Sequence, residues 1–303
     1  MKCINKRFVR VCSLLLVCSL CTISGTGCGE NRLEDAFEAD LPGIGIQTSE
    51  ESSKIPYFAS DLCVTDTDVQ DIEADTEDAL AACFFNLNEK KVLYAKNIHE
   101  RMYPASTTKI MTALVALDKG DLDAQTTVSK EAITFSESGV STAKLKEGDV
   151  LTLRQLLYAL LTVSANDAAN VIAEQIAGSQ DAFVEMMNQE AQKIGATNTH
   201  FVNANGLHSE DHYTTVYDLY LMFNAAMQHE EFLQMLQEKE YQASYQAADG
   251  TTVEAVWSTT NQFTKGDVTV PDGVTAVGGK TGTTTAAMSC LVQLFEDAQG
   301  EQY

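Results

Sequence analysis

The sequence PASTTKIMTALVAL, residues 104–117, decides how this chain folds. Its apolar residues from Lys109 onward recur at helical spacing, and Gly120 follows as a stop signal, so the stretch predicts an amphipathic helix. Ser106 and Lys109 are three residues apart, which places them on one face and lets the lysine amine reach the serine hydroxyl. A serine at a helix start also lies near the positive end of the helix dipole, which favours developing negative charge. The simpler explanation of this S-x-x-K sequence is a capping serine beside a solvated lysine.

Two further short motifs carry groups suited to chemistry. Ser164-Ala165-Asn166 lies between two predicted helices, where a hydroxyl and an amide could pass a proton and hold a substrate amide; helix caps are the simpler explanation. Lys280-Thr281-Gly282 lies on a predicted strand after Gly278-Gly279, and glycines within a strand mark a place where another backbone comes close. A lysine and a threonine hydroxyl at such a place suit a peptide-like substrate with a terminal carboxylate.

The predicted elements run from a hairpin through a helical block to a second group of strands. The predicted strands are 80–87, 92–96, 241–247, 252–257, 275–279 and 286–295, and the predicted helices are 109–117, 153–161, 167–177, 181–194 and 216–227. This order predicts an α+β fold in which helices flank an antiparallel sheet rather than alternating with parallel strands.

The first 27 residues predict a secretory signal peptide. A basic segment precedes a 13-residue apolar run, residues 11–23, which is too short to span a bilayer comfortably, and Gly25-Thr26-Gly27 supplies small residues before Cys28. Either signal peptidase cuts here, or the segment works as a lipobox, which it resembles, and Cys28 is lipidated. Both alternatives place the protein outside the cytoplasm, at the outer face of the membrane or in the cell wall.

The charge of the chain is unevenly distributed. The 303 residues include 43 acidic and 20 basic side chains, a net charge of −23, which argues against nucleic acid as a partner. Many of the acids lie in residues 28–78, which lack periodicity and predict a flexible tether before a domain at 79–303. Four of the eight cysteines fall in the signal peptide, so the remainder are too sparse for a disulfide framework, although one bridge stays open.

The three motifs, in this order, are the set that marks penicillin-binding proteins and β-lactamases. The chain resembles the serine D-alanyl-D-alanine carboxypeptidases, the low-molecular-mass penicillin-binding proteins of peptidase family S11. The resemblance extends from about residue 79 to the end. It includes the hairpin strand 92–97, the helix that begins at Ser106, and the segment SANDAAN, residues 164–170, in which Ala165 replaces the more common glycine. Further similar segments are Asn205-Gly206-Leu207, His212-Tyr213 and Asp218-Leu219. The resemblance implies a β-lactamase-like fold with an all-helical subdomain.

The resemblance also implies an acyl-enzyme mechanism. Ser106 would attack the penultimate D-Ala of a peptidoglycan stem peptide and release the last D-Ala, and water would then hydrolyse the ester. Lys109 would take the serine proton as general base, and Ser164 would relay a proton to the leaving amine. The implied substrate-binding groups are Asn166, Lys280, Thr281, Gly282 and the backbone N–H of Thr283, which forms an oxyanion hole with that of Ser106.

No cofactor or metal is needed for this chemistry, and β-lactams would be covalent inhibitors. His208-x-x-x-His212 has metal-ligand spacing, but it lies in a predicted loop without the glutamate of H-E-x-x-H, so we interpret it as a loop pair.

Alternative functions differ in what they require. A class A β-lactamase needs a glutamate in an E-x-x-L-N-like segment, and residues 178–212 contain none. A non-catalytic wall-binding or antibiotic-sensing lipoprotein would not need the intact motif residues. Endopeptidase and transpeptidase activities use the same residues and stay open. Family members continue beyond the predicted strand 286–295 with a further strand and helix, so we expect this domain to lack them and to expose strand edges and apolar surface.

Overall fold

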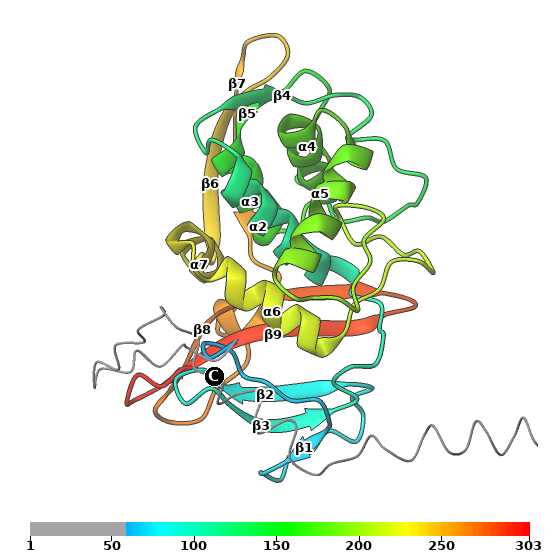
Figure 1. Cartoon of the computed structure of the whole chain (residues 1–303). Helices are drawn as coiled ribbons and strands as arrows, with labels where there is room; N and C mark the ends of the chain where they lie inside the picture. The colour runs from blue at the N-terminus through cyan, green and yellow to red at the C-terminus, as the bar shows by residue number, and fades with distance from the viewer. Residues whose placement is uncertain (1–58) are drawn as a thin grey trace, which may run out of the picture. The chain divides into compact units, whose positions relative to one another are not determined.

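The first sheet begins with the predicted hairpin. The computed structural model describes residues 59–303 (Figure 1), so the predicted signal peptide, Cys28 and the tether up to residue 58 lie outside the described residues. Strands β2 (Ala82–Asn86) and β3 (Lys91–Lys96) pair antiparallel, and the short strand β1 (Val69–Gln70) joins the far edge of β3. The polar turn forms because the Asn86 side-chain oxygen accepts the N–H groups of Asn88 and Glu89 at 3.0 and 2.8 Å.

The predicted tether extends too far into the chain. Within it, Cys63 is fully buried and its N–H donates to the Tyr220 hydroxyl at 2.8 Å, and the Asp68 carboxylate accepts the N–H groups of Asn97 and Ile98. The acidic composition of residues 59–78 therefore coexists with order, because the partners that fix this segment come from distant parts of the chain.

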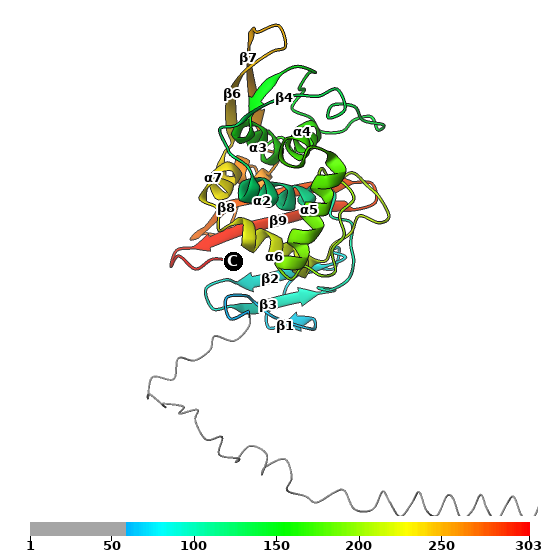
Figure 2. The ribbon, with the colours of Figure 1, turned by 45° about the horizontal axis from the view of Figure 1, so that its top comes forward.

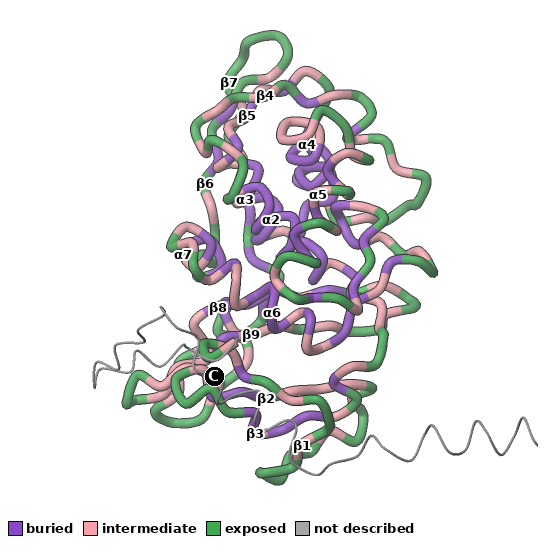
Figure 3. The backbone as a smooth tube through the Cα atoms, viewed as in Figure 1, coloured by how far each residue is buried: buried purple, intermediate pink, exposed green. Residues whose placement is uncertain are grey.

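A block of helices carries most of the buried apolar residues, and the backbone of buried residues is purple in Figure 3. It consists of the 3₁₀ helix η1 (Ala105–Thr108) and helices α2 (Lys109–Lys119), α3 (Leu153–Leu161), α4 (Asn166–Ala177), α5 (Gln180–Lys193), α6 (Val216–Ala226), α7 (Glu230–Gln237) and α8 (Gln262–Lys265). Helix α2 is central and buries residues 109–116 without interruption. Side-chain caps fix several starts: Thr152 forms a capping box with Gln155, and Ser179 and Thr215 accept backbone N–H groups.

The remaining strands form two further antiparallel sheets. Strands β4 (Gln125–Thr127), β5 (Val150–Thr152), β6 (Glu240–Gln246) and β7 (Thr252–Ser258) pair in that order, and β8 (Val274–Thr284) pairs with β9 (Met288–Asp297). The antiparallel α+β class is confirmed, but the single sheet expected from the sequence is divided into three among the described residues. Figures 1 and 2 both show the β8–β9 hairpin between the helical block and the first sheet.

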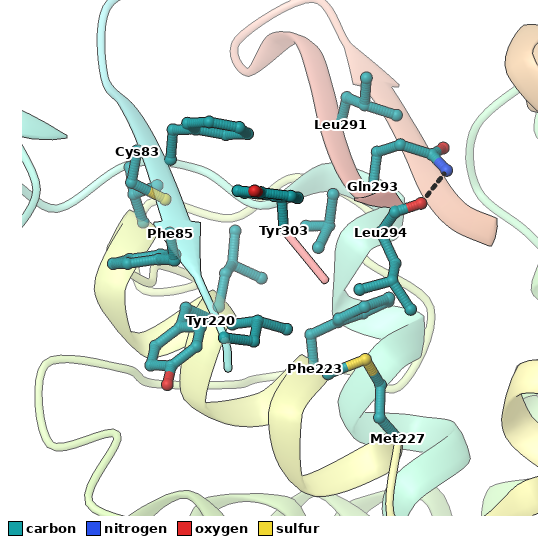
Figure 4. A pocket seen from close by; sticks show the side chains of 14 residues that line it. Cys83, Phe85, Tyr220, Phe223, Met227, Leu291, Gln293, Leu294 and Tyr303 are labelled. Carbon is teal, nitrogen blue, oxygen red and sulfur yellow. Dashed lines mark hydrogen bonds between the residues drawn. The ribbon is translucent and has the colours of Figure 1, made fainter. Parts of the chain in front are cut away.

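An apolar groove separates β2 from β9, with α6 along one side (Figure 4). The ring of Tyr303 lies in this groove and stacks on Phe84 with ring centroids 5.5 Å apart. Gln302 accepts a hydrogen bond of 2.8 Å from the N–H of Leu87, the residue after β2, and Tyr303 exchanges backbone bonds of 2.9 Å with Phe295 on β9. The expected absence of a further strand and helix stays a prediction. Within residues 59–303, no helix is long and apolar enough to cross a membrane.

Candidate active site

The three sequence motifs meet where η1, the start of α4 and β8 come together. Gly282 shows why the last of them needs a glycine: a Cβ atom at this position would lie 2.9 Å from the Ser106 nitrogen, 3.0 Å from the Thr107 nitrogen and 3.1 Å from the Pro104 carbonyl oxygen. All three are backbone atoms, so only a residue without a side chain lets β8 pass this close to η1. The predicted close approach of two backbones therefore occurs, and it brings Lys280 and Thr281 to the helical segment that carries Ser106 and Lys109.

Lys109 lies at the centre of the site with its side chain fully buried. Its Nζ atom lies 3.0 Å from Ser106 Oγ and 2.7 Å from Asn166 Oδ1, and it also contacts the backbone carbonyl oxygen of Asn205. The serine hydroxyl is half-buried, so it is reachable from outside while its lysine partner is not. The helical spacing of Ser106 and Lys109 thus produces the predicted contact.

The charge state of Lys109 follows from its surroundings. Burial lowers the pKa of its amine well below the ordinary value, the neighbouring Lys280 lowers it further, and Asp167 opposes them. A neutral amine has two N–H groups and one lone pair. The oxygens of Asn166 and Asn205 can only accept, so they take the two N–H groups, and the lone pair faces the Ser106 hydroxyl. A charged Lys109 donates to all three oxygens, whereas the neutral form favoured by its lowered pKa leaves a lone pair for the Ser106 hydroxyl.

Lys280 is the second buried lysine of the site and is 1% exposed. Its Nζ donates to Ser164 Oγ at 3.0 Å and to the Thr281 carbonyl at 2.7 Å. Burial lowers the pKa of the Lys280 amine to about 7. An ammonium group has three N–H donors, so one remains for a ligand when Lys280 is charged. This lysine links the strand motif directly to the second motif.

Two residues of the site have backbone conformations that L-amino acids rarely adopt. Ala105, which precedes the serine, has φ of 48°, and Ser164 has φ of 59°. Such conformations cost on the order of 1–3 kcal/mol each and gather at functional sites, where surrounding contacts hold them. Here the two conformations accompany the contacts of the Ser106 hydroxyl with Lys109 and of the Ser164 hydroxyl with Lys280.

Threonine hydroxyls line the mouth of the site. Thr281 Oγ1 lies 2.7 Å from Thr260 Oγ1, and the Thr260 side chain is exposed. Thr260 carries no motif signal in the sequence; it is placed here by its backbone bond to the Thr162 carbonyl at 3.0 Å. Thr283 lies one residue beyond Gly282 at an exposed position, and its role as an oxyanion donor stays a prediction.

Two residues that support the site, Asn170 and Asp167, were not expected from the sequence to do so. Asn170 accepts a hydrogen bond from the Asn205 side chain at 3.0 Å and so fixes the residue whose carbonyl contacts Lys109. The buried Asp167 carboxylate accepts the N–H groups of Ala143 at 2.9 Å and Leu145 at 3.1 Å. In the sequence, Asp167 and Asn170 were indicated only as members of the segment SANDAAN.

The two histidines of the H-x-x-x-H pattern have separate environments. The exposed His208 packs edge-on against Tyr103, whereas the buried His212 hydrogen-bonds to Thr108. No group of three or more His, Cys, Asp or Glu side chains suited to a metal ion occurs within the described residues.

The fold and the site together define a protein of the S-x-x-K class, in which a half-buried serine contacts a fully buried lysine. A sequence model described as D-alanyl-D-alanine carboxypeptidase, Peptidase_S11, matches residues 68–299. The chain belongs to this family.

Known relatives agree with this assignment. The chain is 38% identical over 156 residues to D-alanyl-D-alanine carboxypeptidase DacF of Bacillus subtilis, a match that covers 50% of this chain and 40% of that protein. It is 37% identical over 209 residues to DacB2 of Mycobacterium tuberculosis, covering 68% and 67%. The crystal structure of the Streptomyces K15 DD-transpeptidase superimposes with a TM-score of 0.70 at 31% identity, covering 76% of this chain and 89% of that one. The chain thus spans less than half of the Bacillus relative and about two thirds of the mycobacterial one.

Proposed function

We propose that this protein is an exported serine DD-carboxypeptidase that removes the terminal D-Ala from peptidoglycan stem peptides and is acylated by penicillin. The observation that carries the proposal is the set of three contacts around Lys109. When the amine is neutral, two obligate acceptors, Asn166 Oδ1 and the Asn205 carbonyl, take its N–H groups and leave its lone pair for Ser106, 3.0 Å away. An isolated serine is a weak nucleophile, and this geometry supplies the base that it needs.

Acylation begins with attack of Ser106 Oγ on the carbonyl carbon of the penultimate D-Ala. The hydroxyl proton passes to Lys109 Nζ as the C–O bond forms, and the carbonyl oxygen becomes an oxyanion that the N–H groups of Ser106 and Thr283 receive. One such donor typically contributes about 3 kcal/mol to the transition state. Collapse of the intermediate breaks the C–N bond to the last D-Ala and leaves an ester on Ser106.

The leaving amine needs a proton, and Ser164 is the group that delivers it. The proton taken up by Lys109 returns through the Ser164 hydroxyl, which Lys280 holds with a hydrogen bond of 3.0 Å. Water then attacks the ester and gives a proton to Lys109, which passes it to Ser106 Oγ as the ester C–O bond breaks and the shortened peptide leaves. Every proton in this cycle moves among residues of the chain, the substrate and water.

Substrate orientation comes from the polar groups at the rim. The Asn166 amide nitrogen, which has no hydrogen-bond partner within residues 59–303, faces the substrate amide because its oxygen is taken by Lys109. The charged form of Lys280 and the hydroxyls of Thr281 and Thr260 bind the terminal carboxylate of the substrate. A local cation thereby lets a chain of net charge −23 accept an anionic peptide.

The test is release of D-Ala from a peptide that ends in D-Ala-D-Ala, with Ser106→Ala as the inactive variant and Ser289→Ala, an exposed serine on β9, as the matched control. We expect the wild type and the Ser289 variant to release D-Ala at equal rates and Ser106→Ala to release none. D-Ala release that persists in Ser106→Ala would contradict the assignment of the nucleophile. Rapid turnover of penicillin by the wild type would instead favour a β-lactamase.

A further inference from the structure

His212 is the one fully enclosed histidine with two hydrogen-bond partners from different segments of the described chain. It is 2% exposed and its ring packs edge-on against Phe201. The Val202 N–H donates to His212 Nδ1 at 3.1 Å, and His212 Nε2 lies 2.8 Å from Thr108 Oγ1. The residue lies outside the three sequence motifs, and the acyl-transfer steps described above do not use it.

These two bonds determine the tautomer of the ring. A backbone N–H can only donate, so Nδ1 must carry a lone pair and the proton of a neutral ring lies on Nε2. Nε2 therefore donates to the Thr108 hydroxyl. Burial, assisted by His200, Lys109 and His208, lowers the pKa of His212 to about 4, so the ring is neutral at neutral pH and keeps this arrangement.

The two segments that His212 joins are those that meet at Lys109. Thr108 is the residue directly before Lys109 at the start of α2. Val202 begins the loop that reaches Asn205, whose carbonyl accepts from the Lys109 amine. The same loop is held by a bond from Thr112 Oγ1 to the Ala204 carbonyl at 2.6 Å. His212 and Thr112 thus both hold this loop against the start of α2, while Asn170 on α4 holds the Asn205 side chain.

We propose that His212 is a positioning residue for the general base: by joining Val202 to Thr108, it holds the Asn205 carbonyl against the Lys109 amine. This inference rests on the function proposed above. Without the link, the carbonyl moves away, one N–H of the neutral amine loses its acceptor, and the lone pair is free to turn away from Ser106. Loss of this link lowers the rate of acylation and leaves substrate binding unchanged, because the His212 side chain is buried and does not contact the substrate.

The experiment measures acylation by a fluorescent penicillin as a function of its concentration, which separates the limiting acylation rate from the binding constant. The variants are His212→Ala, His212→Gln, Thr108→Val and the double variant of His212→Ala with Thr108→Val. Glutamine keeps a donor and an acceptor at similar separation, and valine keeps the shape of threonine without its hydroxyl. His200→Gln is the matched control, since His200 is exposed and its side chain hydrogen-bonds only to the Asp211 carbonyl among the described residues.

Thr108→Val removes one hydrogen bond of the link and His212→Ala removes both, and since either change breaks the link we expect each to lower the limiting acylation rate by about tenfold with the binding constant unchanged. The double variant should be no slower than the slower single one, because both remove the same link. Glutamine should restore most of the rate, and His200→Gln should match the wild type.

Each failure has a distinct signature. Wild-type rates in both His212→Ala and Thr108→Val would overturn the positioning role, as would additive losses in the double variant. If His212→Ala does not fold, as judged by thermal unfolding, the Thr108→Val and His212→Gln rates decide the question in the same way. A wild type that is never acylated would instead refute the proposed function itself.

Discussion

Replacing Asn166 by aspartate puts a carboxylate where the structure has a neutral amide oxygen, 2.7 Å from Lys109 Nζ. The proposed mechanism requires Lys109 to be neutral when it takes the Ser106 proton. A carboxylate at this distance favours the ammonium form, so the variant should need a higher pH before the base becomes available. The change is nearly isosteric and therefore perturbs charge more than shape.

The size of the effect follows from Coulomb's law. Two unit charges 2.7 Å apart attract by about 6 kcal/mol at an effective dielectric constant of 20. This value is a ceiling, because burying the carboxylate has its own cost, and measured displacements for such pairs are about one to three pH units. We therefore expect the pH of half-maximal acylation to rise by that amount. At a pH below both midpoints the acylation rate should fall by roughly 10-fold to 1,000-fold.

The assay is the acylation rate with fluorescent penicillin between pH 6 and pH 10, a range that brackets the expected change. Asn166→Ala is the matched control, since it removes the same contacts without adding charge. We expect the alanine variant to lose activity at every pH, and the aspartate variant to recover part of its activity as the pH rises. An aspartate variant whose profile keeps its midpoint or moves to lower pH would refute the neutral-base mechanism.

Two further variants test the packing of β8 against η1 and the burial of Lys280. In Gly282→Ala, the new methyl group would meet the Ser106 nitrogen at 2.9 Å, so β8 must move away and acylation should fall at least about tenfold; an unchanged rate in the labelling assay would contradict the close packing. Lys280 has a pKa of about 7 when folded and an ordinary, higher value when unfolded, so the unfolded state binds more protons between pH 7 and 9 and stability rises with pH. Between pH 7 and 9, the free energy of unfolding measured by urea denaturation should rise by about 2 kcal/mol less in Lys280→Met than in the wild type. An equal rise in both proteins would mean that Lys280 is not buried in the native state.

Elements with strong local patterns could be predicted from the sequence. The hairpin of β2 and β3 and helices α2 to α6 lie close to their expected ranges, because apolar periodicity, caps and stop glycines are signals contained within each segment. Helix α7 was missed because it is short and its N-cap residue, His229, provides no side-chain cap. Its place depends on burying Phe232 and Leu236, which is a property of the whole fold.

The division into three sheets could not be predicted, because strand pairing depends on contacts between distant segments. Strand β4 pairs with β5 across a long irregular segment, and β5 meets β6 through the single pair Val150 and Gln246. Neither pairing leaves a local signal. The order of residues 59–78 was missed for a similar reason, since Cys63 is fixed by Tyr220 far along the chain.

The same difference between local signals and contacts of distant segments applies to the site. The contact of Ser106 with Lys109 follows from their spacing, and the need for Gly282 follows from its position in a strand. The Asn205 contribution is a backbone carbonyl, which any residue type provides, so no sequence motif identifies it. His212 drew attention as half of a metal-like pattern, and only the folded chain shows that its ring joins Thr108 to Val202.

The central claim is that Ser106 forms a covalent ester, and intact-protein mass spectrometry tests it most directly. The purified protein is incubated with penicillin, its mass is followed over time, and the modified residue is located by peptide mapping. We expect a single adduct on Ser106 that persists for many minutes and is absent from Ser106→Ala. An adduct on another residue, or none on the wild type, would contradict it.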